Sequence, residues 1–263
     1  MKYIKQYIYG IAGLLLMSGA LSCTKTFDAK LPLQTGFETT SIIQVYNGIV
    51  NSARTFVSVD GKNVNGSSLT LGSVFPTSGT GFSVQSGTRP LLIRDTAGVT
   101  TQIPLPFTLS LTPGKKFTVF LYDTITSPKQ KTVETNIIVP DDTTARLRFA
   151  NFVYSKVAVP GIDIYSYLRK ANIFTNLQVT DVTDFIPYAS DLTDTISVRI
   201  TGTTTDLMNI TPPTPPPGNV LVPIRSIFTL ASKRSYTFVF RGSYATILTN
   251  SLQVRGLSLF STY

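Results

Sequence analysis

The chain has 263 residues, with no His, no Trp and a single Cys, and only 14% of its residues are charged. A zinc site of the usual His/Cys type, a Ser-His-Asp or Cys-His nucleophile and a disulfide-rich scaffold all lack the residues they need. Lys and Arg number 23 against 14 for Asp and Glu, a formal charge of +9. The length allows one large or two ordinary domains, and 42% hydrophobic residues are enough for a packed core, so we expect a folded chain.

The first 22 residues have the pattern of a bacterial export signal. Lys2 and Lys5 precede the apolar run 11–17, which is shorter than the roughly 20 residues of a membrane-spanning helix. Small residues then lead to Cys23, and Ala20 stands where a lipobox usually has Leu. This segment resembles the relaxed lipoprotein signal of Bacteroidota, which implies cleavage before Cys23 and acyl chains such as palmitate on it. A free or buried cysteine behind an ordinary signal peptide is the alternative.

Residues 23–40 are predicted to be a tether between the lipid and the folded part of the chain. The stretch 24–40 shows no sustained period and contains Pro32 and Gly36. Surface lipoproteins of that phylum often carry an acidic run after the cysteine, and here only Asp28 is present. We expect an outer-membrane lipoprotein of the cell envelope, with surface-facing and periplasmic locations both open.

From Ser41 onward the chain is patterned as β-strands. Runs of β-branched and aromatic residues with a period of two are bounded by Gly, Pro, Asn and Asp, as at 43–46, 56–59, 117–121 and 196–200. The pair Asp60-Gly61 after a strand is a strong hairpin signal. We find no amphipathic helical pattern after the signal, and we therefore predict an all-β fold.

The strand patterns of the first half recur in the second. Three segments of the first half match three of the second in the same order: 42–47 with 146–151, 69–76 with 179–187, and 107–120 with 227–239. Ordered matches of this kind indicate an internal duplication, with a boundary at the polar turn residues 140–144. We predict two tandem antiparallel β-sandwich units, residues 41–139 and 140–263.

Each half resembles domain of unknown function 4397, found in secreted and envelope proteins of bacteria. The matching features are the strand ending at Asn47, Val59–Lys62, Leu71–Val74 and Leu111–Gly114, then Leu147–Asn151, Gly161–Tyr165, Phe185–Pro187 and Ser235–Phe238. The resemblance covers most of 41–244 and implies an extracytoplasmic Ig-like or transthyretin-like sandwich, with no catalytic residues. Arg169-Lys170 replaces an expected Asp-Gly, and 211–219, which contains a proline-rich run, is an insertion.

Acidic residues gather in one part of the second half, at Asp181, Asp184, Asp191 and Asp194. Calcium prefers six to eight oxygen ligands, but the spacing is not that of an EF-hand, so polar turns are the favoured interpretation. Glycoside hydrolysis needs two facing carboxylates, and the chain has only two Glu, at Glu38 and Glu134. We predict no metal, no cofactor and no catalytic residue, and retain an Asp-based hydrolase as an alternative.

The excess of basic residues does not indicate nucleic-acid binding, because the charges are scattered and an exported protein seldom meets nucleic acid. Arg146 and Arg148 alternate with Leu147 and Phe149, as expected for the solvated face of a strand. Weak attraction to acidic polysaccharide or anionic lipid head groups is the alternative. We therefore expect the membrane, through the lipid anchor, and an envelope protein or glycan as partners.

Two groups of residues are candidates for glycan chemistry. Tyr165 and Tyr167 would share one face of a strand and could stack on sugar rings, although half-buried structural Tyr is more common. Asp-Thr segments matching the O-glycosylation acceptor of Bacteroidota envelopes occur at Thr96, Thr124, Thr143 and Thr195. The leading interpretation is a non-catalytic binding or structural module; the alternatives are a glycan-capturing accessory protein and an Asp-based carbohydrate-active enzyme.

Overall fold

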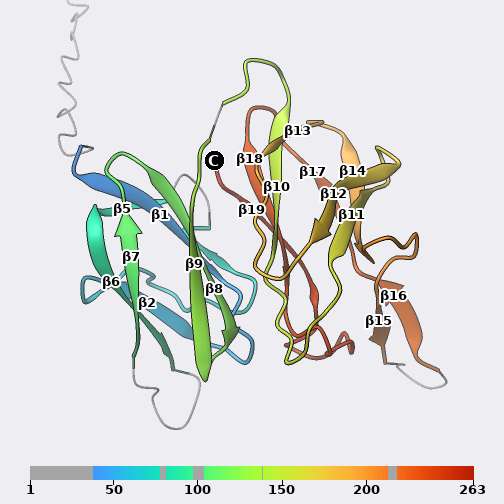
Figure 1. Cartoon of the computed structure of the whole chain (residues 1–263), viewed down its shortest axis with the longest axis horizontal. Helices are drawn as coiled ribbons and strands as arrows, with labels where there is room; N and C mark the ends of the chain where they lie inside the picture. The colour runs from blue at the N-terminus through green and yellow to red at the C-terminus, as the bar shows by residue number, and fades with distance from the viewer. Residues whose placement is uncertain (1–37, 78–80, 97–103, 138, 213–217) are drawn as a thin grey trace, which may run out of the picture. The chain divides into compact units, whose positions relative to one another are not determined.

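The computed structural model describes residues 38–77, 81–96, 104–137, 139–212 and 218–263, and it confirms the all-β prediction (Figure 1). These residues form strands β1 to β19, joined by turns and loops without helix. The signal segment, Cys23 and most of the tether lie outside the described residues. None of the described segments is a helix long and apolar enough to cross a membrane.

Strands of the first half form two sheets. The first inner sheet has the order β4-β1-β8-β9, with β5 also paired to β1, and the first outer sheet has the order β3-β2-β6-β7. The bounds are β1 Thr40–Asn47, β2 Thr55–Val59, β3 Lys62–Asn63, β4 Val74–Phe75, β5 Phe82–Gln85, β6 Gly87–Asp95, β7 Leu105–Leu111, β8 Lys116–Thr124 and β9 Ser127–Glu134. The hairpin predicted at Asp60-Gly61 is confirmed, because both residues have positive φ (51° and 74°) and Val59 pairs with Lys62.

Strands of the second half also form an inner and an outer sheet, and they pair in an order that corresponds to that of the first half. The second inner sheet is β13-β10-β18-β19 and the second outer sheet is β12-β11-β14-β17, while β15 and β16 form a separate hairpin around the proline-rich insertion. The bounds are β10 Ala145–Asn151, β11 Ile162–Ser166, β12 Ala171–Leu177, β13 Ile186–Tyr188, β14 Thr193–Ile200, β15 Met208–Thr211, β16 Val220–Pro223, β17 Arg225–Thr229, β18 Ser235–Arg241 and β19 Gly256–Ser261.

One strand pair in each half departs from the expected antiparallel pairing. Strand β1 runs parallel to β8, with Val45 opposite Val119, and β10 runs parallel to β18, with Phe149 opposite Phe238. A parallel pair needs a long crossover between its strands. In each half that crossover runs mainly through the outer sheet. It also includes short strands that pair with the inner sheet, β4 and β5 in the first half and β13 in the second.

Each half has a hydrophobic core between its inner and outer sheets. In the first half Val45 and Val119 of the inner sheet pack with Val57 and Ile93 of the outer sheet. In the second half Phe149 and Phe238 take the same part, together with Ile164, Val198 and other residues of the outer sheet. The period of two places the intervening residues on the opposite face of each strand.

A third core joins the two halves through their inner sheets. Tyr46, Val74 and Phe120 of the first half cluster with Ala150, Phe152, Val239 and Phe260 of the second. The rings of Phe120 and Phe152 stack with centroids 4.6 Å apart. Both faces of the central inner strands β1, β8, β10 and β18 are therefore largely buried, which is why 42–47 and 117–121 carry few polar residues.

Arg148 lies in this junction between the halves, and its interpretation as a solvated residue is wrong. It is 2% exposed. Its Nε donates to Thr237 Oγ1 at 2.9 Å and its Nη2 to Thr118 Oγ1 at 2.8 Å. Burial lowers the pKa of Arg148 to about 9, and burial together with the nearby Arg148 charge lowers that of Lys116 to about 8. The sequence pattern gave the wrong expectation for Arg148 because the second face of β10 is covered by the first half of the chain. Arg146, two residues earlier on the same face, is only half-buried.

Replacing Arg148 by an apolar residue is expected to leave the protein as stable or more stable. No ion pair among the described residues involves Arg148. The Thr118 and Thr237 hydroxyls, which accept from Arg148, also bond neighbouring hydroxyls, Thr118 with Thr135 and Thr237 with Thr262, both at 2.8 Å. Arg148→Met should therefore raise the free energy of unfolding by about 0–4 kcal/mol, because it removes a desolvated charge.

Urea denaturation at pH 7 measures this change, and Arg146→Met, at a half-buried position of the same strand, is the matched control. The control should change the unfolding free energy by less than about 0.5 kcal/mol. A loss of more than about 2 kcal/mol in Arg148→Met would show that the guanidinium stabilises the junction.

Candidate binding surface

Tyr165 and Tyr167 lie side by side on the face of the second outer sheet that points away from the core. Tyr165 belongs to β11, and Tyr167 follows the end of that strand, held by a hydrogen bond from its N–H to Thr195 O at 2.9 Å. Their ring centroids are 5.2 Å apart and the rings are perpendicular. Tyr167 is 36% exposed.

Arginines from two neighbouring strands cover these rings. Arg199 of β14 places its guanidinium carbon 3.5 Å from the Tyr165 ring centroid, and Arg225 of β17 lies 4.7 Å from that of Tyr167. The carboxylate of Asp206 lies between the two guanidinium groups. It accepts from Arg199 Nε at 2.9 Å, from Arg225 Nε at 2.8 Å and from the Tyr167 hydroxyl at 2.6 Å. We call these five residues the Tyr–Arg cluster.

The Tyr–Arg cluster has a net positive charge. The Asp206 side chain is only 4% exposed. Burial alone would raise its pKa, but hydrogen bonds from Tyr167, Arg199, Ser197 and Arg225 outweigh that effect and lower the pKa to about 2. Two arginines face this one carboxylate, and Arg225 is 42% exposed, so the surface can attract an anionic group. The covering arginines also take up ring area that could stack on a sugar.

Sequence reasoning singled out the two tyrosines but missed Arg199, Asp206 and Arg225. Arg199 occupies an outward position of the segment 196–200, which is predicted as a strand, so its position could have been found from the sequence. Arg225 begins β17 and lies before the predicted segment 227–239, so it could not. Asp206 lies outside the strands, in the connection that leads to the β15–β16 hairpin. Only the pairing of β11, β14 and β17 brings these residues together.

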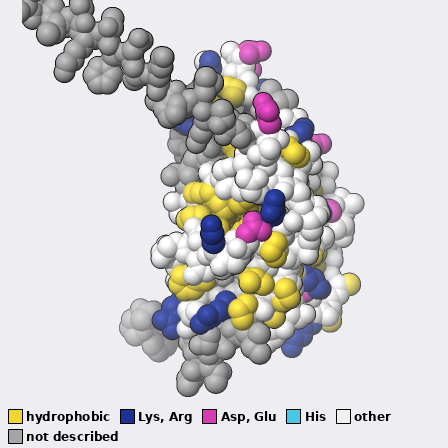
Figure 2. Space-filling view, turned by 90° about the vertical axis from the view of Figure 1, so that its left-hand side faces the viewer, with side chains coloured by type: hydrophobic (Ala, Val, Ile, Leu, Met, Phe, Trp, Pro, Cys, Tyr) yellow, Lys and Arg dark blue, Asp and Glu magenta, His cyan; other side chains and the backbone are white. Residues whose placement is uncertain are grey.

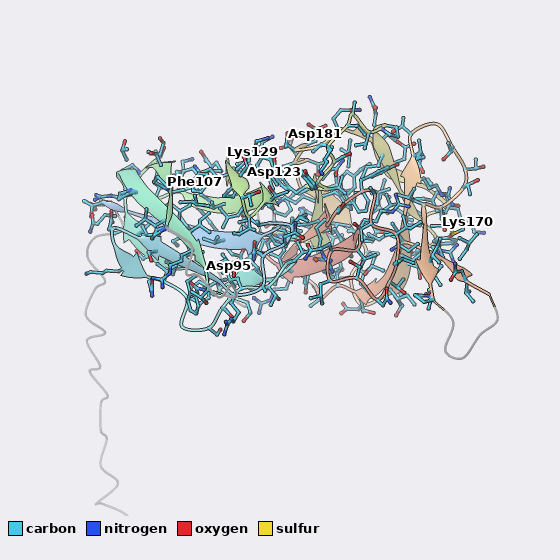
Figure 3. All side chains as sticks on the ribbon, turned by 90° about the horizontal axis from the view of Figure 1, so that it is seen from below. Asp95, Phe107, Asp123, Lys129, Lys170 and Asp181 are labelled. Carbon is cyan, nitrogen blue, oxygen red and sulfur yellow. The ribbon has the colours of Figure 1, made fainter. Side chains whose placement is uncertain are left out.

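The four acidic residues considered for calcium or hydrolysis have separate surroundings. Asp194 is buried and accepts from Ser166 Oγ at 2.5 Å, from Leu168 N at 2.8 Å and from the Tyr188 hydroxyl. Asp181, labelled in Figure 3, accepts from Gln178 N at 2.7 Å. Asp191 has a positive φ of 58° in a turn, and Asp184 is exposed. In the part of the chain that the structure describes, no three acidic side chains converge to hold a metal ion.

The four candidate glycosylation residues differ in accessibility. Thr143 is exposed in the turn before β10. Thr96 follows β6 and Thr195 lies within β14, and both are half-buried. Thr124 ends β8 beside the Asp123–Lys129 ion pair of 2.7 Å, both labelled in Figure 3, and is half-buried as well. Thr143 therefore presents the most open hydroxyl of the four.

Comparison with known proteins does not assign the chain to a family. No family model matches the chain, and no curated protein is significantly similar to it. The resemblance of each half to domain of unknown function 4397 therefore stays a prediction from its sequence motifs. Fold and site together define an all-β protein with a basic, tyrosine-bearing outer face.

Proposed function

We propose that the chain is a lipid-anchored, non-catalytic binding and structural module of the bacterial cell envelope. The observation that supports it most is the Tyr–Arg cluster, in which exposed aromatic and basic groups are held rigidly on a sheet. Rigid presentation of such groups is typical of binding surfaces. The buried carboxylates Asp163, Asp194 and Asp206 are instead engaged in hydrogen bonds that hold loops and strands together.

Glycan capture is the second candidate, and the exposure of Arg225 beside Tyr167 favours it. A net positive surface with an aromatic edge suits an acidic polysaccharide better than a neutral one. The test is an array of acidic and neutral polysaccharides, probed with the full-length protein in detergent micelles. Tyr165→Ala or Tyr167→Ala should weaken binding to acidic members by about tenfold, as expected when one good contact is lost.

Tyr263→Ala is the matched control, since this ring is also covered by an arginine, Arg234 at 5.7 Å, but lies outside the Tyr–Arg cluster. Its binding should equal that of the unchanged protein. If the Tyr167→Ala protein bound acidic polysaccharides as tightly as the unchanged protein, the Tyr–Arg cluster would not be part of the binding surface. Release of oligosaccharides that is lost in Asp181→Asn or Asp184→Asn would overturn the non-catalytic proposal.

Lipid attachment at Cys23 is tested by fractionation. In Cys23→Ala the acceptor for acyl chains is gone, so the protein should move from the membrane fraction to the soluble fraction. Immunoblotting of both fractions measures the shift, with Thr24→Ala as the control that should remain in the membrane. A Cys23→Ala protein retained in the membrane fraction would show that another element anchors it.

A further inference from the structure

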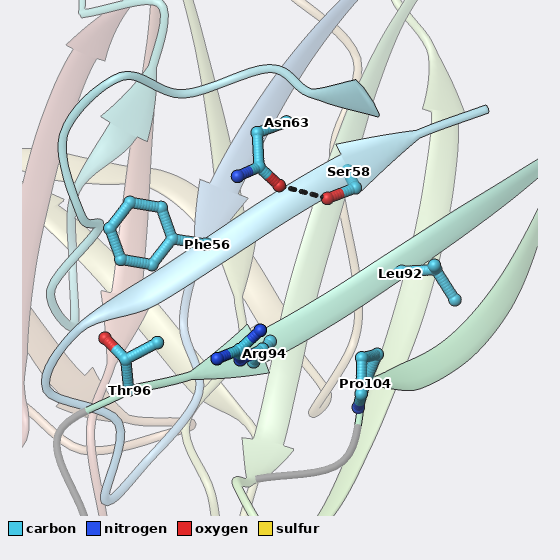
Figure 4. Close-up of a pocket in the computed structure, with 7 residues that line it drawn as sticks. All are labelled: Phe56, Ser58, Asn63, Leu92, Arg94, Thr96 and Pro104. Carbon is cyan, nitrogen blue, oxygen red and sulfur yellow. Dashed lines mark hydrogen bonds between the residues drawn. The ribbon is translucent and has the colours of Figure 1, made fainter. Parts of the chain in front are cut away.

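The outer face of the first outer sheet carries a pocket of about 270 Å³, which we call the first-half pocket (Figure 4). Figure 2 shows this side of the molecule, where β5, β6 and β7 lie and where apolar side chains gather among Lys and Arg side chains. The pocket is lined by Phe56, Ser58, Asn63, Leu92, Arg94, Thr96 and Pro104. Its walls combine an aromatic ring and aliphatic groups with hydroxyl and amide groups, which suits a small amphipathic ligand.

Among the described residues that line the pocket, Arg94 alone is charged. It is exposed, and within the described part of the chain neither an ion pair nor a side-chain hydrogen bond engages its guanidinium group. Asn63 accepts from the Ser58 hydroxyl through its oxygen, which leaves its amide nitrogen available as a donor. The pocket thus offers donors and one positive charge beside the Phe56 ring.

The second half has an arginine at the position that corresponds to Arg94. Arg94 follows the core residue Ile93 on β6, as Arg199 follows the core residue Val198 on β14. The two strands hold the same position in the order of their sheets. Arg199 binds the carboxylate of Asp206 at 2.9 Å.

Asp206 comes from the connection between β14 and β17. The corresponding connection of the first half, residues 96–104, contains no Asp or Glu. In the second half, therefore, the chain itself supplies the carboxylate that pairs with Arg199. In the first half the connection supplies no carboxylate for Arg94, so this arginine is available to a carboxylate of a ligand.

We propose that the first-half pocket binds a carboxylate-bearing sugar ring, a uronate residue of an acidic polysaccharide. The carboxylate would pair with Arg94, as Asp206 pairs with Arg199, and the apolar face of the ring would lie on Phe56 and Leu92. Ring hydroxyls would meet Ser58 and Asn63. A polyhydroxylated ring fits this mixture of walls better than an acidic peptide side chain, which offers no hydroxyls. The assignment rests on the glycan-capturing role and names its ligand class.

Calorimetric titration of the full-length protein in micelles with a uronate trisaccharide tests this assignment. The neutral trisaccharide of the same linkage is the comparison ligand. The uronate should bind at least about tenfold more tightly than the neutral sugar. Arg94→Gln should remove that preference in a Tyr167→Ala protein, in which the Tyr–Arg cluster no longer contributes. Phe56→Ala should weaken both sugars, and Arg94→Lys should retain part of the preference, since it keeps the charge without the planar fork. Lys156→Gln removes one charge from an exposed loop of the second half and should have no effect.

The outcomes separate the pocket from the proposed function. If Tyr167→Ala weakens uronate binding and Arg94→Gln does not, the pocket assignment is overturned while glycan capture stands. If an acidic peptide of equal charge binds at Arg94 as tightly as the trisaccharide, the sugar assignment is overturned and a carboxylate site remains. If the unchanged protein binds no sugar of the array, both the glycan-capturing role and the uronate assignment are overturned. Each variant's thermal unfolding serves as the folding control.

Discussion

Phe120→Ala is expected to lower the free energy of unfolding by about 3–5 kcal/mol, although Phe120 lies outside the core that each half forms between its own two sheets. The side chain is fully buried between the two inner sheets. It stacks on Phe152 of the second half at 4.6 Å and approaches Tyr46 at 5.9 Å. Truncation leaves a cavity in the junction that neither half can fill by itself, because both inner sheets are fixed by their own cores.

Urea denaturation measures this loss, with Phe107→Ala as the matched control. Phe107, labelled in Figure 3, is only half-buried on β7 and should cost clearly less. A double-mutant cycle of Phe120→Ala and Phe152→Ala should give a coupling of about 0.5–1.5 kcal/mol, since the rings touch. A loss below about 1 kcal/mol for Phe120→Ala would mean that the junction between the halves contributes little to stability.

Asp206→Ala is expected to cost about 2–4 kcal/mol. The change leaves the guanidinium groups of Arg199 and Arg225 facing one another without their shared carboxylate, and the Tyr167 hydroxyl loses its acceptor. Asp184→Ala, at an exposed position, is the control and should cost less than about 0.5 kcal/mol. Equal stability of the two variants would show that the ion pairs of the cluster are not stabilising.

The low pKa of Asp206 also predicts how stability depends on pH. Its folded pKa of about 2 is below the ordinary value of 3.8, so the unfolded chain binds the proton first as pH falls. The contribution of Asp206 is therefore fully present above about pH 4 and is lost as pH falls from about 4 to about 2. The unchanged protein should lose more stability over this range than Asp206→Ala does. Identical losses in the two proteins would contradict the assignment.

Acetate offers an independent check on the role of Asp206 as a built-in ligand. A free carboxylate that takes its place between Arg199 and Arg225 binds only the folded state, and it should restore part of the stability lost in Asp206→Ala. The measurement compares unfolding in sodium acetate and sodium chloride of equal concentration. Equal stability in the two salts would show that the cluster does not accept an external carboxylate.

Much of the fold was predictable because strand formation depends mainly on residues that are close together in the sequence. The period of two predicts the strands, and the Asp60-Gly61 pair predicts a turn whose positive φ values favour these residues. Of the candidate surface, the shared face of Tyr165 and Tyr167 was also predictable, since residues two apart along an extended segment point to the same side, and Tyr167 lies only one residue beyond β11. Asp206 was not, because its contacts with Arg199 and Arg225 depend on how a long connection returns to the sheet.

The sequence by itself determined a chain of β-strands, poor in charge and without histidine, whose one cysteine has a predicted chemical role. Tertiary structure alone decided which of the strand faces are buried. Arg148 illustrates this, since its alternation with apolar residues is that of a solvated face, and only the packing of the two inner sheets removes it from water. The physical reason is that a strand specifies two faces, while the partners that cover them come from residues far away in the chain.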